Sequence, residues 1–474
     1  MEGTQQTMSK SPPEATSTPH LRRALGLWDL VLYGLIVIQP TAPMPVYGVM
    51  SMRSHGYALI TVLLAMVAMM FTAISYGKMA SAYPSAGSAF TYVGREIHPA
   101  LGYLTGWSMA MDYVLNPLIC TILCGKLAMN FFPGIPYAVW VVAFVAMFTV
   151  LNLQGIKTSA HINSGLVAVM GVVILLFLAA TIHYVHATPH DGVTYFTSPF
   201  YDPRTFSVRA VLGGTSLAVL TYIGFDGIST LSEEARNPRR NIMLATVLVC
   251  LLTGLLASIE VYAAQLVWPG AMNFPDVDTA FVFVAGRAGG PWLFAIINMT
   301  LLVATFGSAL GAQLGAARLF YGMGRSGALP RSFFGAIEPK RRIPRNNVLL
   351  VGAVALIGAM ILNFERGVEL LNFGALLAFM GVNISALVRF YFREARRRWF
   401  NFVSPVLGFL ICLLLWLSLS WRAKLLGIGW MIIGLAYGAY NTRGFRRDLL
   451  NLDSPDGDDE GNSAATNGSS ISQV

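Results

Sequence analysis

Six stretches of the sequence, each close to the length of a bilayer-spanning helix, contain no Lys, Arg, Asp or Glu. They cover residues 57–76, 136–156, 290–317, 347–364, 403–421 and 425–442. A helix needs about 20 apolar residues to cross the hydrocarbon layer, whereas buried helices of soluble proteins usually carry a polar face. Charged residues make up 12% of the chain, about half the share of a soluble domain. The sequence therefore predicts an all-α polytopic membrane protein.

The apolar segments and the polar residues between them predict twelve transmembrane spans. They run near residues 28–52, 57–80, 100–131, 136–154, 161–186, 207–232, 242–268, 290–322, 347–363, 368–391, 403–421 and 424–441. With both termini in the cytoplasm, roughly three quarters of the 32 basic residues fall on the cytoplasmic side, as the positive-inside rule requires. The outer side keeps Arg53, Lys126, Arg204, Arg209, Arg287, Arg366, Arg422 and Lys424. We therefore expect a multi-pass protein of the plasma membrane, or of the inner membrane in a bacterium.

The two ends of the chain have a different composition from the spans. Residues 1–20 are rich in Ser, Thr and Pro without an apolar core, which predicts a disordered cytoplasmic tail rather than a cleaved signal peptide. Residues 448–474 become acidic and then rich in Ser, Asn and Gly, which predicts a second disordered tail. The transporter domain is expected between them, over residues 21–447. Because the basic residues are spread over several short loops, no nucleic-acid partner is expected.

Two predicted spans contain residues that a continuous helix does not tolerate. The first span has three prolines within residues 40–45, and each removes a backbone donor. In the sixth span, Gly224 and Gly227 flank Asp226 at mid-membrane depth. Irregular backbone occurs there only where protein buries it or where it lines a wet cavity. Breaks five spans apart are expected of an inverted repeat whose broken helices form a substrate site, and kinks without function are the alternative.

Further motifs lie around these breaks at defined positions along the chain. They are AISYGK at 73–78, YPSAGSAFTY at 83–92, GYLTGW at 102–107, GFD at 224–226, SEEARNP at 232–238, RLFYGMGR at 318–325, LP at 329–330 and NFGA at 372–375. In this order the sequence resembles the amino acid–polyamine–organocation (APC) family of permeases over roughly residues 21–447, and within it the putrescine importers. The resemblance implies a substrate held where spans 1 and 6 unwind, against spans 3, 8 and 10.

The same resemblance implies the leucine-transporter-type fold. In that fold ten helices form two inverted repeats, here at about 28–186 and 207–391. Two peripheral helices follow at about 403–441.

Three acidic residues fall inside predicted spans, and no Lys or Arg lies as deep. They are Asp112 in span 3, Asp226 in span 6 and Glu260 in span 7. Charged groups near the bilayer centre are costly and usually functional. A buried carboxylate without a basic partner either holds a proton or awaits a cationic ligand. We therefore expect a small amine substrate, a coupling proton, or both.

Asp226 is the leading candidate because it sits in the sixth-span break. In the arginine–agmatine and putrescine carriers that the sequence resembles, an acidic residue occupies the matching place. Asp226 is expected to meet the substrate amine, to bind the coupling proton, or to alternate between them. The alternative is a structural carboxylate that accepts the freed N–H groups of the broken helix. Glu260 is the second proton-coupling candidate, with a hydrogen bond to a neighbouring span as its alternative.

The other substrate-site candidates surround these acids. Tyr113 can face an ammonium group through a cation–π contact, and Asn116 lies one helical turn from Asp112. Hydrogen bonding between helices is the alternative for these side chains. The unwound backbone and the aromatic residues near it complete the set, which adds Gln39, Thr41, Ala42, Tyr222, Gly224 and Phe373.

The first break departs from the pattern of the family's amino-acid carriers. Those carriers hold the α-carboxylate with the bared N–H groups of a Gly-small-Gly turn, but residues 39–43 read QPTAP here. Prolines have no N–H, which favours a diamine such as putrescine, although Thr41 and Ala42 keep their amides. Span 5 also has no Lys to carry a proton. An amino-acid permease or exchanger of the same fold is the alternative, and a channel is less favoured.

The sequence holds no pattern of enzyme chemistry. It has no zinc-binding His pair, nucleophile elbow or phosphate loop, so we expect no catalytic residue, cofactor or metal. Cys120 and Cys124 lie one turn apart, but free Cys usually packs as a small apolar side chain. The expected partners are a small amine or amino acid, a coupling proton and the lipid bilayer.

Overall fold

The computed structural model describes residues 25–83, 88–155, 160–190, 192–232, 234–270, 273–325, 327, 329–394 and 398–441. The predicted tails, 1–20 and 448–474, lie outside these residues. All the regular elements of the described residues are helices, and the one β-bridge among these residues joins Leu25 to Ala235. The all-α prediction is therefore confirmed.

Each predicted span has a helical counterpart that begins and ends within a few residues of it. The counterparts are α1 (Leu27–Ile38) with α2 (Pro43–Arg53), α3 (Ala58–Ala82), α5 (Pro99–Phe131), α6 (Tyr137–Leu153), α7 (Ala160–Ala187), α9 (Val208–Ala218) with two 3₁₀ turns, α10 (Pro238–Val267), α12 (Pro291–Arg325), α14 (Arg345–Ile361), α15 (Phe364–Leu387), α16 (Trp399–Ser418) and α17 (Trp421–Asn441). Four short helices lie between them, namely α4 (Ser88–Glu96), α8 (Gly192–Thr197), α11 (Ala280–Gly289) and α13 (Arg331–Phe334).

Nine helical stretches of the described residues are long and apolar enough to cross a membrane, and the bent pair of α1 and α2 makes a tenth. The helices α6 and α14 contain 17 residues each, so they are shorter than the others. Multiple crossings are thus established by length and composition, while the full number of twelve stays a prediction.

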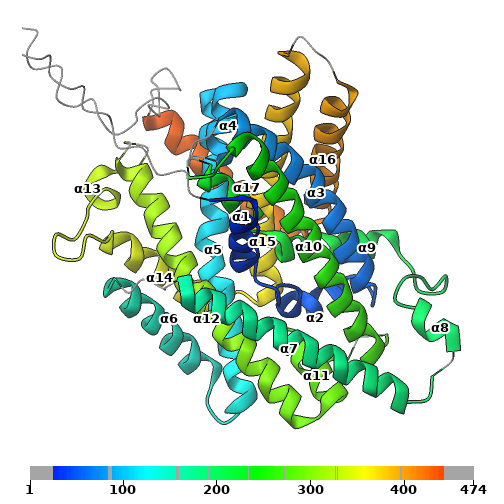
Figure 1. Cartoon of the computed structure of the whole chain (residues 1–474). Helices are drawn as coiled ribbons and strands as arrows, with labels where there is room; N and C mark the ends of the chain where they lie inside the picture. The colour runs from blue at the N-terminus through cyan, green and yellow to red at the C-terminus, as the bar shows by residue number, and fades with distance from the viewer. Residues whose placement is uncertain are drawn as a thin grey trace, which may run out of the picture.

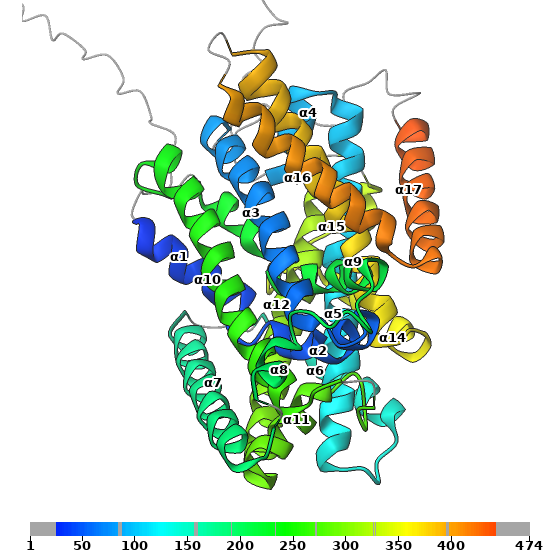
Figure 2. The ribbon, with the colours of Figure 1, turned by 90° about the vertical axis from the view of Figure 1, so that its right-hand side faces the viewer.

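The first span is broken at its prolines. The helix α1 ends at Ile38, the φ of 70° at the following Gln39 lies outside the helical region, and α2 begins at Pro43. Proline is well placed at the first position of a helix because its missing N–H would have no partner there. The two helices meet at 58°, and Figure 2 shows them as separate segments that point in different directions.

The sixth span is broken at its first central glycine. After α9, 3₁₀ turns cover Val219–Tyr222 and Phe225–Leu231, with Gly224 between them at a φ of +118°. That backbone conformation favours glycine. A Cβ at Gly224 would lie 3.0 Å from a methyl carbon of Val37 on α1. The two breaks therefore lie against each other, although the predicted spans that contain them are five apart in the sequence.

A closely packed helix pair holds this centre in place. The helices α3 and α10 run side by side in both ribbon views (Figures 1 and 2). Gly77 allows the close approach, because a Cβ there would lie only 2.5 Å from the Cα of Met243. Small residues commonly permit such contacts between membrane helices.

The last two helices lie at the periphery of the bundle. The helix α17 is joined to α5 by a reciprocal tryptophan pair: Trp107 donates to the carbonyl of Trp430 at 2.9 Å, and Trp430 donates back at 3.0 Å. Their rings stack with centroids 4.8 Å apart. The helix α16 is held by Cys412, whose sulfur lies 3.5 Å from the hydroxyl of Thr72 on α3.

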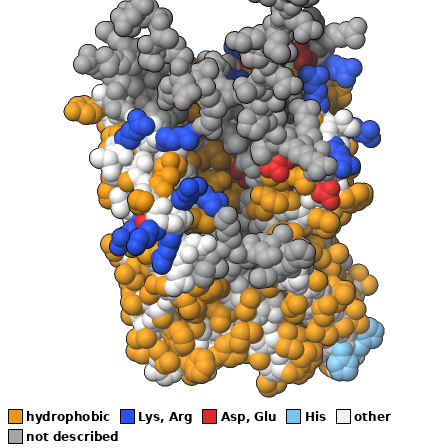
Figure 3. All heavy atoms as spheres, turned by 60° about the vertical axis from the view of Figure 1, so that its left-hand side comes forward, with side chains coloured by type: hydrophobic (Ala, Val, Ile, Leu, Met, Phe, Trp, Pro, Cys, Tyr) orange, Lys and Arg blue, Asp and Glu red, His pale blue; other side chains and the backbone are white. Residues whose placement is uncertain are grey.

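The outer surface is that of a protein immersed in lipid. On the face drawn in Figure 3, hydrophobic side chains cover a broad lower belt, and Lys and Arg gather above it. Large apolar residues of several helices are widely exposed, as with Leu175 at 66% and Ile361 at 71%. Apolar exposure on this scale marks contact with another apolar phase, which here is the bilayer.

Candidate functional site

A cavity of about 460 Å³ lies where the two breaks meet α5, α7 and α12. Its walls are Tyr33, Ile36, Val37 and Gln39 of the first span, Asp112, Tyr113 and Asn116 of α5, Leu166, Val167 and Met170 of α7, Ile223, Gly224, Asp226 and Gly227 of the sixth span, and Gly307, Ser308, Gly311 and Ala312 of α12. Its volume is typical of a small-molecule site. Six of the ten predicted substrate residues are thus brought together from three segments of the chain.

The cavity contains two carboxylates and no side-chain base. Asp112 and Asp226 both line it, and no Lys, Arg or His is among the described lining residues. Neither acid forms an ion pair with any described residue. An unpaired carboxylate is costly to bury away from water, so this arrangement suits a ligand that brings its own positive charge.

Asp226 is held by the backbone of the break in which it lies. The side chain is 9% exposed, and the backbone amides of Gly224, Asp226 and Gly227 lie around its carboxylate. The N–H of Gly227 also donates to the carbonyl of Gly224 at 3.0 Å. These surroundings are compatible with the structural alternative weighed for Asp226, and they lie at the wall of the cavity.

The α5 residues face the cavity as a polar strip. Asp112, Tyr113 and Asn116 are each half-buried, and the Oδ1 of Asn116 accepts a bond from the Cys120 thiol at 3.3 Å. The ring of Tyr113 lies 3.6 Å from where a Cβ of Gly315 would stand, so it packs against α12. The carboxylate of Asp112 keeps its full capacity to accept hydrogen bonds from a ligand.

Gln39 closes one end of the cavity at the first break. Its side-chain amide donates to the carbonyl of Ala304 on α12 at 3.3 Å. This bond ties the unwound end of α1 to the opposite wall. Gln39 therefore has a positioning contact as well as a place in the lining.

Four predicted substrate residues lie outside the cavity lining. Thr41 and Phe373 are buried at 1% exposure, and Ala42 is half-buried. Tyr222 is fully buried and donates to the carbonyl of Val62 at 2.9 Å, so it fastens the sixth span to α3. The ring of Phe373 packs on Trp416, with centroids 5.2 Å apart.

Glu260 is buried in α10 and does not line the cavity either. Its exposure is 0%, and neither carboxylate oxygen has a hydrogen-bond partner among the described residues. An acid in such a place is more stable with its proton than without it. The described residues also contain no group of three or more His, Cys, Asp or Glu that could hold a metal ion.

The resemblance placed span 8 at the substrate site, but none of the α12 residues that line the cavity was predicted. Gly307 and Gly311 face open space, since a Cβ at either position would meet no atom within 4 Å. The missing side chains create part of the cavity, and Ser308 adds a hydroxyl between them. The spacing of Gly307, Gly311 and Gly315 places all three on one helix face, which is the signal that the sequence offered for this wall.

Comparisons with known proteins agree with this architecture. The chain is 37% identical over 453 residues to the low-affinity putrescine importer PlaP of Escherichia coli strain K12. The matched region covers 93% of this chain and 98% of that protein. It is 27% identical to the branched-chain amino acid permease BcaP of Bacillus subtilis strain 168, over 88% of this chain and 92% of that one. The methylthioribose transporter of the same organism is also 27% identical, over 93% and 98%.

A family model described as amino acid permease matches residues 42–444. This match covers most of the chain and both halves of the bundle. The resemblance predicted from the motifs is therefore confirmed, and the chain belongs to the amino acid permease family of APC transporters.

Proposed function

We propose that this protein is a secondary active transporter of small amines that accepts putrescine-like diamines in preference to neutral α-amino acids. The observation that carries the proposal is the charge of the central cavity, which has two carboxylates and no base among its described lining residues. A diamine supplies two ammonium groups to such a site, and Tyr113 adds an aromatic face beside them. A zwitterionic amino acid would also bring a carboxylate to a cavity that is already negative.

The first break offers little to bind that carboxylate. Within residues 39–45, three positions are proline, and the N–H groups of Gln39, Ala42 and Met44 already donate to the carbonyls of Leu35, Gln39 and Thr41. Thr41 is the one residue of this stretch whose N–H has no described acceptor. A single amide is a weak anchor for an anion that usually takes several hydrogen bonds.

The sixth break offers equally little. Its backbone amides at Gly224, Asp226 and Gly227 already lie around the Asp226 carboxylate, and the N–H of Gly227 donates to the carbonyl of Gly224. A substrate carboxylate would have to displace an internal one. The sixth break, on the other side of the cavity, therefore also favours an amine over an α-amino acid.

The proposal includes the finer architecture that the sequence predicted. In it the chain crosses the plasma membrane, or a bacterial inner membrane, twelve times with both termini in the cytoplasm. Residues 28–186 and 207–391 act as inverted repeats around the site, and 403–441 stay peripheral. Gly224 in the sixth-span break lies against Val37 near the end of α1. This contact supports a substrate site that the two broken spans share and that moves during transport.

We place the coupling proton on Asp226, because a proton and an ammonium group would compete for the same carboxylate. Glu260 is the second candidate for the proton, since it is buried without a partner. Coupling through Asp226 makes binding of substrate and release of the proton one exchange step, whereas coupling through Glu260 would have to act at a distance.

The second candidate function is an amino-acid permease of the same fold. It is favoured by the free amide of Thr41 and by the name of the Bacillus subtilis relative BcaP. The name of the Escherichia coli relative, a putrescine importer with higher identity, supports the diamine instead.

Proteoliposomes that contain the purified full chain would test the proposal. Labelled putrescine should accumulate under an inside-acidic pH gradient, because exchange at Asp226 releases a proton when the amine binds, and a protonophore should abolish the accumulation. Unlabelled putrescine should compete far better than alanine or leucine. If alanine or leucine competes tightly and diamines do not, the amino-acid function stands. Saturable counterflow would exclude a channel.

A further inference from the structure

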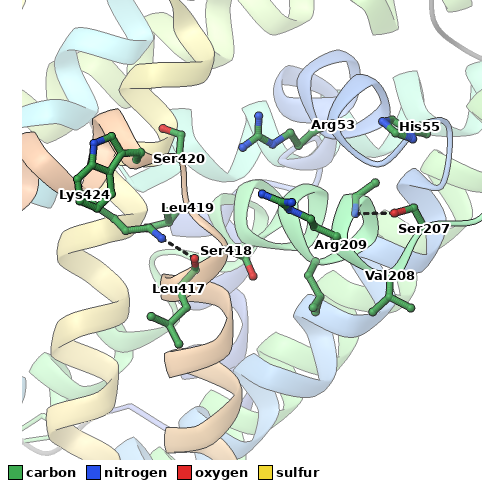
Figure 4. A pocket seen from close by; sticks show the side chains of 14 residues that line it. Arg53, His55, Ser207, Val208, Arg209, Leu417, Ser418, Leu419, Ser420 and Lys424 are labelled. Carbon is green, nitrogen blue, oxygen red and sulfur yellow. Dashed lines mark hydrogen bonds between the residues drawn. The ribbon is translucent and has the colours of Figure 1, made fainter.

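A second and larger cavity lies at one end of the bundle, away from the central site. Its volume is about 950 Å³, and it lies between α2, the start of α9 and the segment that joins α16 to α17. Figure 4 shows the side chains of Arg53 and Arg209 extending into it from α2 and α9, toward Ser418 and Ser420 on its far wall. None of its described lining residues lines the central cavity.

This end cavity is cationic. Arg53, Arg209 and Lys424 line it, and no Asp or Glu is among its described lining residues. Three of the basic residues that the sequence assigns to the outer side of the membrane are thus gathered at one place. Arg209 is exposed and forms no hydrogen bond or ion pair with any described residue.

The other two cations are only partly engaged. Arg53 lies 3.9 Å from a carboxylate oxygen of Glu365 and 3.7 Å from one of Glu369, distances too long for hydrogen bonds. Glu369 is itself held by Ser420, whose hydroxyl and backbone N–H both donate to it. The Nζ of Lys424 donates to the carbonyl of Leu417 at 2.6 Å, which leaves its charge without a carboxylate.

Two helix beginnings add to the positive charge. Ser207 caps α9 by accepting the N–H of Ala210 at 3.4 Å, and Ser420 caps α17 by accepting the N–H of Ala423 at 3.3 Å. Both serines line the cavity. The amino-terminal ends of helices carry partial positive charge, so the two helices add to the field of the three side chains.

The rim of the cavity is apolar and faces outward. Val208 is 63% exposed, Leu417 is 54% exposed and Trp421 is 69% exposed, and all three belong to the lining. Tryptophan is enriched at the membrane–water interface. A cationic interior with an apolar rim matches a molecule that has an anionic head and acyl chains.

We propose that this cavity binds the phosphate group of an anionic phospholipid, with the guanidinium groups of Arg53 and Arg209 and the ammonium of Lys424 around the phosphate. Arg can donate two parallel hydrogen bonds to phosphate. The exposed rim favours a lipid headgroup over free phosphate, because the acyl chains would lie along Val208, Leu417 and Trp421. The helices α2 and α9 belong to the two broken spans, so a lipid held here would contact both.

Native mass spectrometry of the purified full chain in detergent would test the site. Phosphatidylglycerol should bind more tightly than the zwitterionic phosphatidylcholine. The double variant Arg209→Gln/Lys424→Gln should bind phosphatidylglycerol about tenfold more weakly, since each basic residue near a bilayer adds substantially to the attraction for anionic lipid. Its melting temperature without added lipid should match that of the native protein.

The matched control is Arg366→Gln/Arg422→Gln. It removes the same charge at the same predicted side of the membrane, from exposed residues that do not line the cavity. This control should keep native affinity for phosphatidylglycerol. Equal losses in the two double variants, or equal affinity of the native protein for both lipids, would overturn the site. Inorganic phosphate that competes fully at the same concentration would overturn the lipid as the source of the phosphate.

Discussion

Glu96 and Asp226 are both buried carboxylates, but their surroundings differ. The Glu96 side chain is fully buried and lies 2.7 Å from the guanidinium of Arg393 and 3.7 Å from that of Arg389. Asp226 is surrounded by backbone amides and has no ion pair with any described base. Arg389 and Arg393 therefore balance the negative charge of Glu96. No described residue balances the charge of Asp226, which leaves that role to a ligand or a proton.

Other acids follow the same division. Asp276, in the loop before α11, lies 2.9 Å from Lys126. Asp112 within α5 and Glu260 within α10, like Asp226 at the sixth-span break, have no ion pair with any described residue. A structural role explains a paired acid well, because pairing offsets the cost of burial. An unpaired acid at mid-membrane depth is better explained by a ligand or a proton.

The largest effect is expected from Asp226→Asn, which keeps the size of the side chain but removes its charge. Putrescine binding should weaken by about 2–3 kcal/mol, the range of a hydrogen bond to a charged group, and proton-driven accumulation should be lost. The melting temperature should change little. A purely structural Asp226 predicts the reverse, with a lowered melting temperature and near-native transport. Uptake and melting measured on one preparation separate the two.

The opposite pattern is expected for Glu96→Gln. The variant leaves Arg389 and Arg393 without a carboxylate, but both arginines are about half exposed, so water compensates in part. We expect a loss of about 1–2 kcal/mol of unfolding free energy and an unchanged affinity for putrescine. A stable variant with weakened putrescine binding would mean that the paired acid also serves the site.

The two breaks could be predicted from the sequence because their causes are local. Prolines at 40 and 43 remove two backbone donors within one helical turn, which favours a break there, and glycine at 224 permits a φ of +118° that other residues avoid. The acids at 112 and 226 were equally visible, since charge inside an apolar run is rare. Their meeting in one cavity followed from the resemblance to a known family rather than from residue spacing.

The direction in which an individual side chain points could not be predicted in the same way. Tyr222 lies two residues from the break, yet it points to Val62 and not into the cavity. Phe373 packs on Trp416 of a peripheral helix. The open wall at Gly307 and Gly311 exists because no neighbour fills that space, which depends on how α12 is turned against α5 and α7.

Asp278 is intermediate between Glu96 and Asp226, and its substitution should have a smaller effect. Burial raises the pKa of Asp278, in the loop before α11, to about 6, with Asp276 adding to the shift and Lys126 opposing it. The folded state therefore holds this proton more tightly than the unfolded state. Its contribution to stability is complete below about pH 4 and is lost as the pH rises through about 6.

The variant Asp278→Asn should not show this loss of stability as the pH rises. Its stability relative to the native protein should rise by on the order of 1 kcal/mol between pH 4 and pH 7. Lys126 keeps Asp276 at 2.9 Å, so the local ion pair survives the change. Melting curves across this pH range measure the difference, and a constant difference would show that Asp278 is not perturbed.

The smallest effect is expected from Glu260→Gln. The acid has no described partner to lose, and the amide keeps the neutral form that burial favours. Uptake, pH dependence and melting temperature should stay close to native values. If the variant still exchanges putrescine across the membrane but no longer concentrates it, the coupling proton belongs to Glu260 and not to Asp226.

Equilibrium binding of putrescine and of butylamine to the purified native protein tests the central claim most directly. The two amines share a four-carbon chain, but putrescine carries two ammonium groups and butylamine only one. If Asp112 and Asp226 each meet one positive charge, putrescine should bind roughly tenfold to a hundredfold more tightly, as expected for one added contact between charged groups. Equal affinities, or tighter binding of leucine than of either amine, would contradict the account.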